Sequence, residues 1–132
     1  MIEVEVVEKE QQAVVAYILR EDGKVLSVTR KDTGQHSAPG GKVEPGETRL
    51  VAVEREVEED TGIRIINPDC VHVGIHESGC VVFSYLVTRW IGEPVAREPG
   101  TSVAWVDPIE IVNGFGGERA RASLIAAGVL EL

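Results

Sequence analysis

The contrast between two neighbouring segments most constrains what this chain can fold into. Residues 31–45 are interrupted by glycines and prolines at Gly34, Pro39, Gly40, Gly41 and Pro45. These residues end regular structure and predict a loop. Residues 47–61 contain neither glycine nor proline, and helix-forming residues dominate them. The two segments together predict a loop that leads directly into a helix.

The predicted helix, Glu47–Thr61, has one apolar face. Its apolar residues recur at positions i, i+3 and i+7, on one side of an α-helix: Leu50, Val53 and Val57. Either Glu47 or Thr48 is expected to begin the helix, and Gly62 is a suitable residue to end it.

The rest of the chain predicts strands and one further helix. Apolar or alternating segments bounded by turn residues predict strands at Ile2–Val7, Ala13–Leu19, Val25–Arg30, Val71–His76, Val81–Ile91 and Thr101–Val106. The second and third strands are expected to form a hairpin around the turn Glu21–Lys24, and Glu118–Val129 is expected to be a helix. This order predicts an α/β sandwich in which helices cover a mixed sheet, within a single domain over residues 1–132.

Acidic side chains crowd the end of the predicted helix. Glu56, Glu59 and Asp60 fall within roughly 100° of one another around the helix axis, whereas Glu54 and Glu58 point elsewhere. Carboxylates on one stripe repel each other, and the helix dipole disfavours negative charge at the C-terminus. A hard divalent cation such as Mg²⁺ would reverse that cost, because it binds oxygen ligands. For the helix alone, a solvated acidic face is the alternative interpretation.

The charge balance argues against two broad classes of partner. The chain has 13 basic and 22 acidic residues and a formal charge of −9, which disfavours binding to nucleic acid polymers and membrane surfaces. No apolar run is long enough to span a membrane, and the acidic N-terminal segment MIEVEVVEKE does not resemble a secretory signal. We therefore expect a cytoplasmic location, with Cys70 and Cys80 as reduced packing residues.

The loop and the helix together carry a known motif. From Gly41 to Ile63 the sequence is GKVEPGETRLVAVEREVEEDTGI, which resembles the Nudix box, G-x5-E-x7-R-E-U-x-E-E-x-G-U with U aliphatic. The matching residues are Gly41, Glu47, Arg55, Glu56, Val57, Glu59, Gly62 and Ile63. Asp60 stands where the family has its last glutamate. Its side chain is one methylene shorter, but it keeps the charge on the stripe, so activity is expected to remain.

The resemblance implies a fold, a cofactor and a set of ligands. The fold is the Nudix α/β/α sandwich, and the activity is a Mg²⁺-dependent hydrolysis in which Mn²⁺ can replace Mg²⁺. The metal ligands would be Glu56, Glu59 and Asp60, with the carbonyl of Gly40 nearby. Glu59 would also help to deprotonate the attacking water.

Two further expectations concern the side chains around these ligands. By the same resemblance, Glu47 and Arg55 would pair with each other and fix the loop against the helix without binding metal. Glu56 and Glu59 are expected to have no cationic side chain as a partner, so that only metal holds the two carboxylates.

Two segments outside the motif resemble the small oxidised-nucleotide-cleaving branch of the family. WIGEPVAREPG, residues 90–100, implies Glu98 as a further metal ligand or base. VTRKDTGQH, residues 28–36, implies Arg30 as a substrate contact, with Lys42 as another phosphate partner. The alternatives are that Glu98 is a loop residue without a functional role, and that Arg30 and Lys42 are ordinary surface cations.

The base of a nucleotide could be bound by several residues. Phe83, Tyr85 and Trp105 are candidates for stacking on a base, with core packing as the alternative, and Asn113 is a candidate for a hydrogen bond to a base edge. The leading hypothesis is hydrolysis of a nucleoside triphosphate to the monophosphate and pyrophosphate. The alternatives are a nucleotide-sugar or dinucleotide pyrophosphatase and a non-catalytic nucleotide-sensing module. The expected partner is a small nucleotide, and a homodimer is left open.

Overall fold

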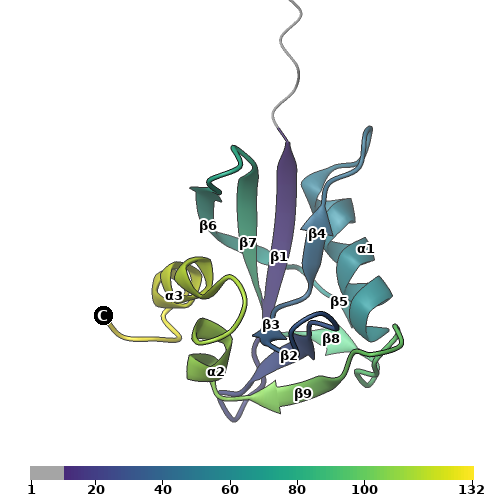
Figure 1. The fold of residues 1–132 in the computed structure, drawn as a ribbon, viewed down its shortest axis with the longest axis vertical. Coiled ribbons are helices and arrows are strands. Elements are labelled where there is room, and N and C mark those ends of the chain that lie inside the picture. Colours follow the sequence, from purple (N-terminus) through teal and green to yellow (C-terminus); the bar gives the residue numbers. More distant parts are fainter. Residues whose placement is uncertain (1–10) are drawn as a thin grey trace, which may run out of the picture.

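Strand β1 (Gln12–Ile18) forms the middle of the fold. In the computed structural model, which describes residues 11–132, β1 pairs in parallel with β7 (Val81–Val87) and antiparallel with β4 (Gly40–Lys42). Strand β6 (Asp69–Ile75) continues this sheet beyond β7, giving the order β4–β1–β7–β6 (Figure 1). The predicted strand Ile2–Val7 lies outside the described residues.

Both faces of β1 are buried, which explains its central place. Val14, Ala16 and Ile18 pack on one side of the sheet, whereas Val15 and Tyr17 pack on the other. A near-continuous apolar run of this kind is typical of a strand that is covered on both faces and has a parallel neighbour.

The predicted hairpin of residues 13–19 and 25–30 is wrong. Apart from an isolated bridge between Leu19 and Val25, the second of these strands lies in another sheet of the order β3–β2–β9. That sheet has the bounds His36–Ser37 for β3, Val25–Thr29 for β2 and Val103–Val106 for β9. Backbone hydrogen bonds still close the turn between the two segments. The strands diverge after it because β4 and β7 already occupy both edges of β1.

Helix α1 (Arg49–Thr61) agrees closely with the predicted helix. The N–H of Val51 donates to the side chain of Thr48 over 3.2 Å, which caps the first turn, and Gly62 ends the helix at a φ of 77°. Its buried residues are Ala52, Val53, Val57 and Thr61. Leu50, which was expected on this face, is 49% exposed, because it lies in the first turn, at the end of the helix.

The predicted strand Val81–Ile91 is two strands. β7 ends at Val87, and after Thr88 and Arg89 the short strand β8 (Trp90–Ile91) pairs with β5 (Arg64–Ile65) in a separate ladder. Apolar residues stand on both sides of Thr88 and Arg89 because β7 and Trp90 both pack against the same core cluster. Hydrophobic pattern alone does not show which partner a strand takes.

The C-terminal part contains two helices where one was predicted. Helix α2 (Pro108–Val112) begins with proline, and α3 (Gly117–Ala126) is shorter than the predicted Glu118–Val129. Gly128, with a φ of 76°, lies just beyond the end of α3 and turns the chain away from the helix.

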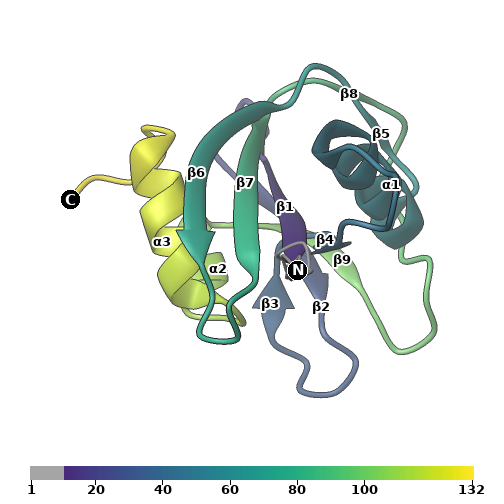
Figure 2. The same cartoon turned by 90° about the horizontal axis from the view of Figure 1, so that it is seen from above.

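The helices cover opposite faces of the sheet that contains β1. Figure 2 shows α1 on one side and α2 and α3 on the other. One core cluster joins α1 to β1, β2, β5 and β7, and a second joins α2 and α3 to β1, β2, β7 and β9. Burial of a single large apolar side chain contributes about 1.5–3 kcal/mol, so these two clusters hold the layers together. The predicted α/β/α sandwich with a mixed sheet is confirmed. Within residues 11–132, no helix has the length and apolar character that a membrane span requires.

Candidate active site

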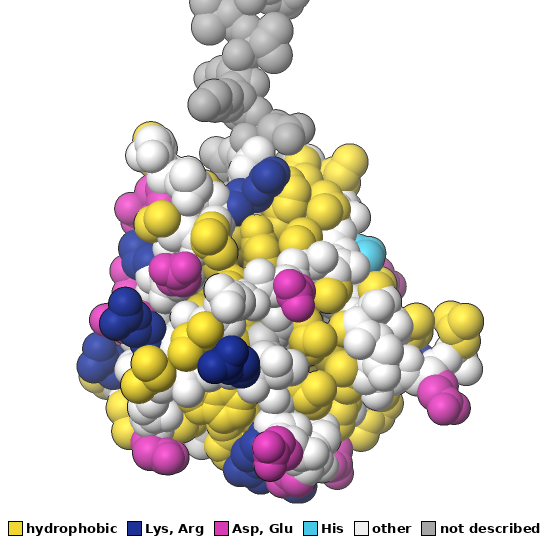
Figure 3. All heavy atoms as spheres, turned by 180° about the vertical axis from the view of Figure 1, so that it is seen from behind, with side chains coloured by type: hydrophobic (Ala, Val, Ile, Leu, Met, Phe, Trp, Pro, Cys, Tyr) yellow, Lys and Arg dark blue, Asp and Glu magenta, His cyan; other side chains and the backbone are white. Residues whose placement is uncertain are grey.

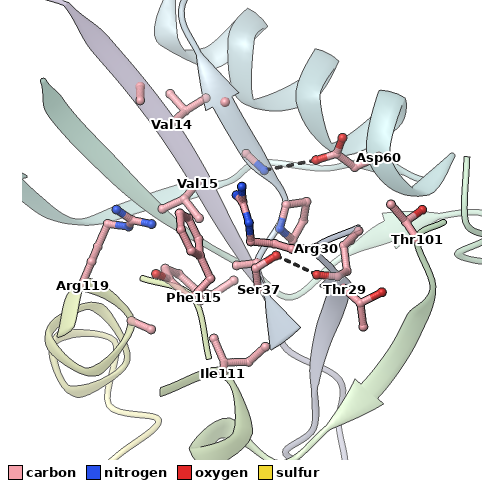
Figure 4. Close-up of a pocket in the computed structure, with 18 of the residues that line it drawn as sticks. Val14, Val15, Thr29, Arg30, Ser37, Asp60, Thr101, Ile111, Phe115 and Arg119 are labelled. Carbon is pink, nitrogen blue, oxygen red and sulfur yellow. Dashed lines mark hydrogen bonds between the residues drawn. The ribbon is translucent and has the colours of Figure 1, made fainter. Parts of the chain in front are cut away.

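A cavity of about 460 Å³ lies between the β1–β4 side of the sheet and helices α2 and α3. Asp60 and Thr101 lie on one side of it, and Ile111, Phe115 and Arg119 lie on the other (Figure 4). Residues from β1, β2, β4, α1, α2 and α3 contribute to its walls, so segments far apart in the sequence meet here. Volumes of 300–1,000 Å³ are typical of small-molecule sites.

Asp60 supplies a carboxylate to this cavity from the last turn of α1. Its Oδ2 accepts a hydrogen bond from the N–H of Gly40 over 3.3 Å. Burial, together with the negative charges of Glu56, Glu59 and Glu98, raises the pKa of Asp60 to about 6, against the effect of the Gly40 hydrogen bond. Four carboxylates therefore lie within electrostatic reach of one another.

The Glu56 side chain lies directly against the backbone of strand β4. A Cβ atom built at Gly41 would collide with the Glu56 carboxylate, so the absence of a side chain at Gly41 leaves the space that this carboxylate occupies. The Glu56 side chain is 14% exposed. Burial raises its pKa, and Arg55 opposes that shift.

Arg55 connects the loop to the carboxylates of α1. Its guanidinium donates to both oxygens of Glu47, over 2.7 and 2.9 Å, and to the carbonyl of Lys42 over 3.1 Å. The hydrogen bonds from Arg55 lower the pKa of Glu47 to about 2. The predicted pairing of Arg55 with Glu47 is therefore present, in the two-point geometry that suits a guanidinium and a carboxylate.

The same guanidinium overturns one expectation about the metal ligands. Glu56 and Glu59 were expected to have no cationic partner, but the Nη1 of Arg55 lies 3.0 Å from Glu56 and 3.2 Å from Glu59. Glu59 is one helical turn beyond Arg55, so their side chains share a face, and Nη1 remains free for them because Nε and Nη2 bind Glu47.

Positive charge enters the cavity from the end of β2. Arg30 and Lys31 both line it. Lys31 forms an ion pair with Glu98, with 2.5 Å between Nζ and Oε1. Arg30 pairs with Asp32, and its guanidinium lies 4.0 Å from the centre of the Phe115 ring.

The structure brings only some of the predicted site residues to the cavity wall. Gly40, Asp60, Glu98 and Arg30 line it, whereas Glu56 and Glu59 lie beside it and the side chain of Lys42 is not part of the lining. Within residues 11–132, no three His, Cys, Asp or Glu side chains are already grouped closely enough to hold a metal ion.

The donor set nevertheless fits a hard divalent cation. Glu56, Glu59 and Glu98 raise the pKa of Asp60, which means that their negative charges converge on one carboxylate. Oxygen ligands of this kind suit Mg²⁺. Glu56 and Glu59 would exchange their contacts with Arg55 for a cation, since the side chain of Glu59 is 57% exposed and has room to move.

The aromatic candidates identified from the sequence belong to the core. Tyr85 is buried, Phe83 packs against the same cluster beneath Arg49, and Trp105 stacks on Trp90 with ring centroids 5.3 Å apart. None of the three lines the cavity, and neither does Asn113.

Phe115 and Arg119 line the cavity where the predicted aromatic residues do not, and neither was predicted from the sequence. Three glycines of the segment NGFGG, at positions 114, 116 and 117, are the signal that could have indicated them. Gly114 allows this loop to pack closely on β3, where the N–H of Phe115 donates to the carbonyl of His36 over 2.9 Å, whereas Gly117 packs on the backbone of Val112 and Gly116 lies against Arg119.

Comparisons with known proteins lead to one family. The family model for the NUDIX domain matches residues 9–127. An 8-oxo-dGTP diphosphatase from Haemophilus influenzae is 38% identical over 102 residues, which cover 71% of this chain and 74% of that protein. An 8-oxo-dGTP diphosphatase from Escherichia coli is 34% identical over 94 residues, or 61% and 69% of the two chains. A solved structure from work on MutT of Aliivibrio salmonicida and Vibrio cholerae has a TM-score of 0.76 and 30% identity, covering 91% of this chain and 99% of that one.

Proposed function

This chain belongs to the Nudix family of hydrolases, and from that premise we propose that it converts a nucleoside triphosphate to the monophosphate and pyrophosphate. One observation carries the proposal. The cavity joins an end that carries the carboxylates Asp60 and Glu98 to an apolar end at Ile111 and Phe115. The first end suits cations and phosphates, and the second suits a planar base. The relatives named 8-oxo-dGTP diphosphatase make 8-oxo-dGTP the first substrate to test.

Mg²⁺ is the proposed cofactor, and Mn²⁺ is its proposed substitute. Glu56, Glu59, Asp60 and Glu98 would hold the metal together with the carbonyl of Gly40. When bound, the metal neutralises phosphate charge and makes a water molecule more acidic. Asp60 is already fixed by the Gly40 N–H, whereas Glu98 would first leave Lys31.

The other steps of the proposed hydrolysis depend on side chains of this cavity. Water attacks one phosphorus of the phosphoanhydride and the bond from that phosphorus to the bridging oxygen breaks. The leaving group takes the electron pair of that bond: it is pyrophosphate if the α-phosphorus is attacked and the nucleoside monophosphate if the β-phosphorus is attacked. Glu59 accepts the proton of the water, and Glu56 and Glu98 stand as further carboxylates near the same place. Arg30 contacts the substrate, and Lys31, once released from Glu98, faces its phosphates. Lys42 is proposed only as an outer phosphate contact, because its side chain does not line the cavity.

Arg55 and Glu47 position this machinery. The ion pair connects residues on either side of Thr48, where α1 is capped, and Arg55 also holds the carbonyl of Lys42. Strand β4, which carries Gly40 and Gly41, and the loop after it are thereby fixed against the carboxylates of the helix.

A substrate panel tests the proposal. Nucleoside triphosphates, including 8-oxo-dGTP and dGTP, are compared with nucleotide sugars and dinucleotides in Mg²⁺, and the products are separated by chromatography. We expect monophosphate and pyrophosphate from the triphosphates, and no product when a chelator is present. Preferential cleavage of a nucleotide sugar or dinucleotide would support the alternative pyrophosphatase. Absence of turnover on every substrate would support a sensing module, and full turnover in chelator would contradict the metal site.

The proposed partner is a small nucleotide, acted on in the cytoplasm within a single domain over residues 1–132. On the face shown in Figure 3, basic side chains of the described residues lie among acidic ones and do not form a continuous surface. With the net charge of −9, this does not favour a nucleic acid backbone. Cys70 and Cys80 are both free, as is usual for cytosolic proteins, but the expected packing role is wrong for Cys70, which is exposed.

A further inference from the structure

Arg119 is a half-buried cation at the apolar end of the cavity. It lies in the first turn of α3, and its side chain lines the cavity on the same side as Ile111 and Phe115 (Figure 4). Gly116 makes room for it, since a Cβ atom at that position would lie 2.5 Å from Nη2 of the guanidinium.

Arg119 has no anionic partner in the described part of the chain. None of the ion pairs formed within residues 11–132 includes it. Its Nε is buried and has no hydrogen-bond partner there. A guanidinium carries five N–H donors, and unpaired buried donors are costly. A ligand that brings acceptors to this place would remove that cost.

Tyr17 adds a second donor at the same end. It belongs to β1, lines the cavity, and is almost completely buried. Burial raises the pKa of Tyr17, whereas the positive charge of Arg119 and hydrogen bonding with Ser123, Arg119 and Ser84 oppose this shift, so the hydroxyl is protonated at neutral pH and lies beside the Arg119 guanidinium.

The surroundings of Arg119 favour a base rather than a phosphate. Val15, Ile111 and Ala120 provide apolar walls, whereas Asp60 and Glu98 belong to the cation-binding end that takes the phosphates in the proposed function. The planar Phe115 ring on Arg30 extends the apolar wall toward that end. A neutral ring with a carbonyl at its edge matches this combination of apolar walls, the unpaired Nε of Arg119 and the neighbouring Tyr17 hydroxyl.

We propose that Arg119, together with Tyr17, selects a 6-oxopurine by donating hydrogen bonds to the O6 carbonyl of the base. Guanine and hypoxanthine present O6 as an acceptor, whereas adenine presents an N6 amino group, a donor that would face the donors of Arg119. The proposal rests on the proposed function, because it assigns the base of the nucleotide that the site would hydrolyse.

The test compares dGTP and dITP, which share O6, with dATP, which lacks it. In wild type, kcat/KM should be higher for dGTP and dITP than for dATP. Arg119→Met should lower kcat/KM for both 6-oxopurines by about 5- to 100-fold, the range for one lost two-point contact to a base edge, and leave dATP within about twofold. Arg121→Met is the matched control, because Arg121 lies on α3 with an exposed side chain and outside the cavity lining.

A binding measurement without metal separates this inference from the proposed activity. Calorimetric titration with dGMP and dAMP should show that Arg119→Met weakens only dGMP, and thermal unfolding checks that the variant is folded. The inference is overturned if wild type does not prefer the 6-oxopurines, if Arg119→Met leaves the preference unchanged, or if all nucleotides weaken equally. If wild type hydrolyses none of the triphosphates, the proposed function fails, and the two monophosphate titrations still decide the role of Arg119.

Discussion

At the scale of the single residue, Arg55 determines how Glu56 and Glu59 respond to neutralisation. Each carboxylate is repelled by its neighbours and attracted by Nη1 of Arg55. Replacement by glutamine removes both effects, so Glu56→Gln and Glu59→Gln should each change the free energy of unfolding without metal by less than about 0.5 kcal/mol. The stability gain expected from repulsion alone should not occur. In Mg²⁺, kcat should fall at least about 100-fold, a loss of roughly 2.7 kcal/mol of transition-state stabilisation.

Glu58 provides the control for this pair of substitutions. It lies on the same helix, its side chain is exposed, and it forms no ion pair within residues 11–132. Glu58→Gln should leave both the chemical unfolding curve and kcat close to wild type. If Glu58→Gln were the inactive variant and the other two turned over normally, the assignment of the metal-binding face would be wrong.

Asp60 tests the one departure from the motif. Its carboxylate faces the cavity and is held by the Gly40 N–H, so the shorter side chain remains in a position to bind a cation. Asp60→Ala should raise the Mg²⁺ concentration for half-maximal activity by at least about tenfold, whereas Asp60→Glu should keep it near wild type. The measurement is initial rate against Mg²⁺ concentration. An alanine variant with an unchanged Mg²⁺ dependence would show that Asp60 is not a ligand.

At the scale of the element, the ion pair between Glu47 and Arg55 ties the loop to α1 in a pH-dependent way. The folded state lowers the pKa of Glu47 from an ordinary 4.5 to about 2. A lowered carboxylate pKa adds stability that is fully present above about pH 4.5 and is lost as the pH falls toward 2. Glu47→Gln should therefore reduce stability at pH 7, with a difference from wild type that shrinks toward pH 2.

Urea unfolding at a series of pH values measures this difference. Glu54→Gln is the matched control, because Glu54 is an exposed residue of α1 without an ion pair in residues 11–132. A difference between wild type and Glu47→Gln that stays constant from pH 7 to pH 2 would contradict the role of the ion pair.

The elements also differ in how well the sequence predicts them. Helix α1 is well predicted, since a cap, an apolar period of 3.6 residues and a final Gly62 all indicate the same segment. Strands β3, β4, β5 and β8 are two or three residues long, too short for a period to be visible. Each of these strands is defined by the strand with which it pairs, and its own residues do not show that partner.

At the scale of the whole molecule, β1 connects the two halves of the core. Its alternate side chains enter the cluster with α1 and the cluster with α2 and α3. We expect residues 1–132 to unfold as one domain, because neither cluster is complete without β1. Tryptophan fluorescence follows Trp90 and Trp105 near one cluster, and far-ultraviolet circular dichroism follows the helices on both faces. The two urea transitions should coincide, and separated midpoints would contradict a single cooperative domain.

The loop predicted over residues 31–45 is wrong in part, because the short strands β3 and β4 form within it. The sequence by itself determined the family and helix α1, and it indicated the candidate ligands Gly40, Glu56, Glu59 and Asp60. These features lie within one stretch, residues 40–63, where spacing along the chain fixes which side chains share a face. The tertiary structure decided three other matters: the separation of β1 from β2, the contact of Arg55 with Glu56 and Glu59, and the meeting of Asp60 and Glu98 with Phe115 and Arg119. Each of these three features depends on how distant segments pack together or on the direction that a long, flexible side chain takes. Periodicity describes a segment and its faces, whereas the partner of each face depends on how the whole chain buries its apolar surface.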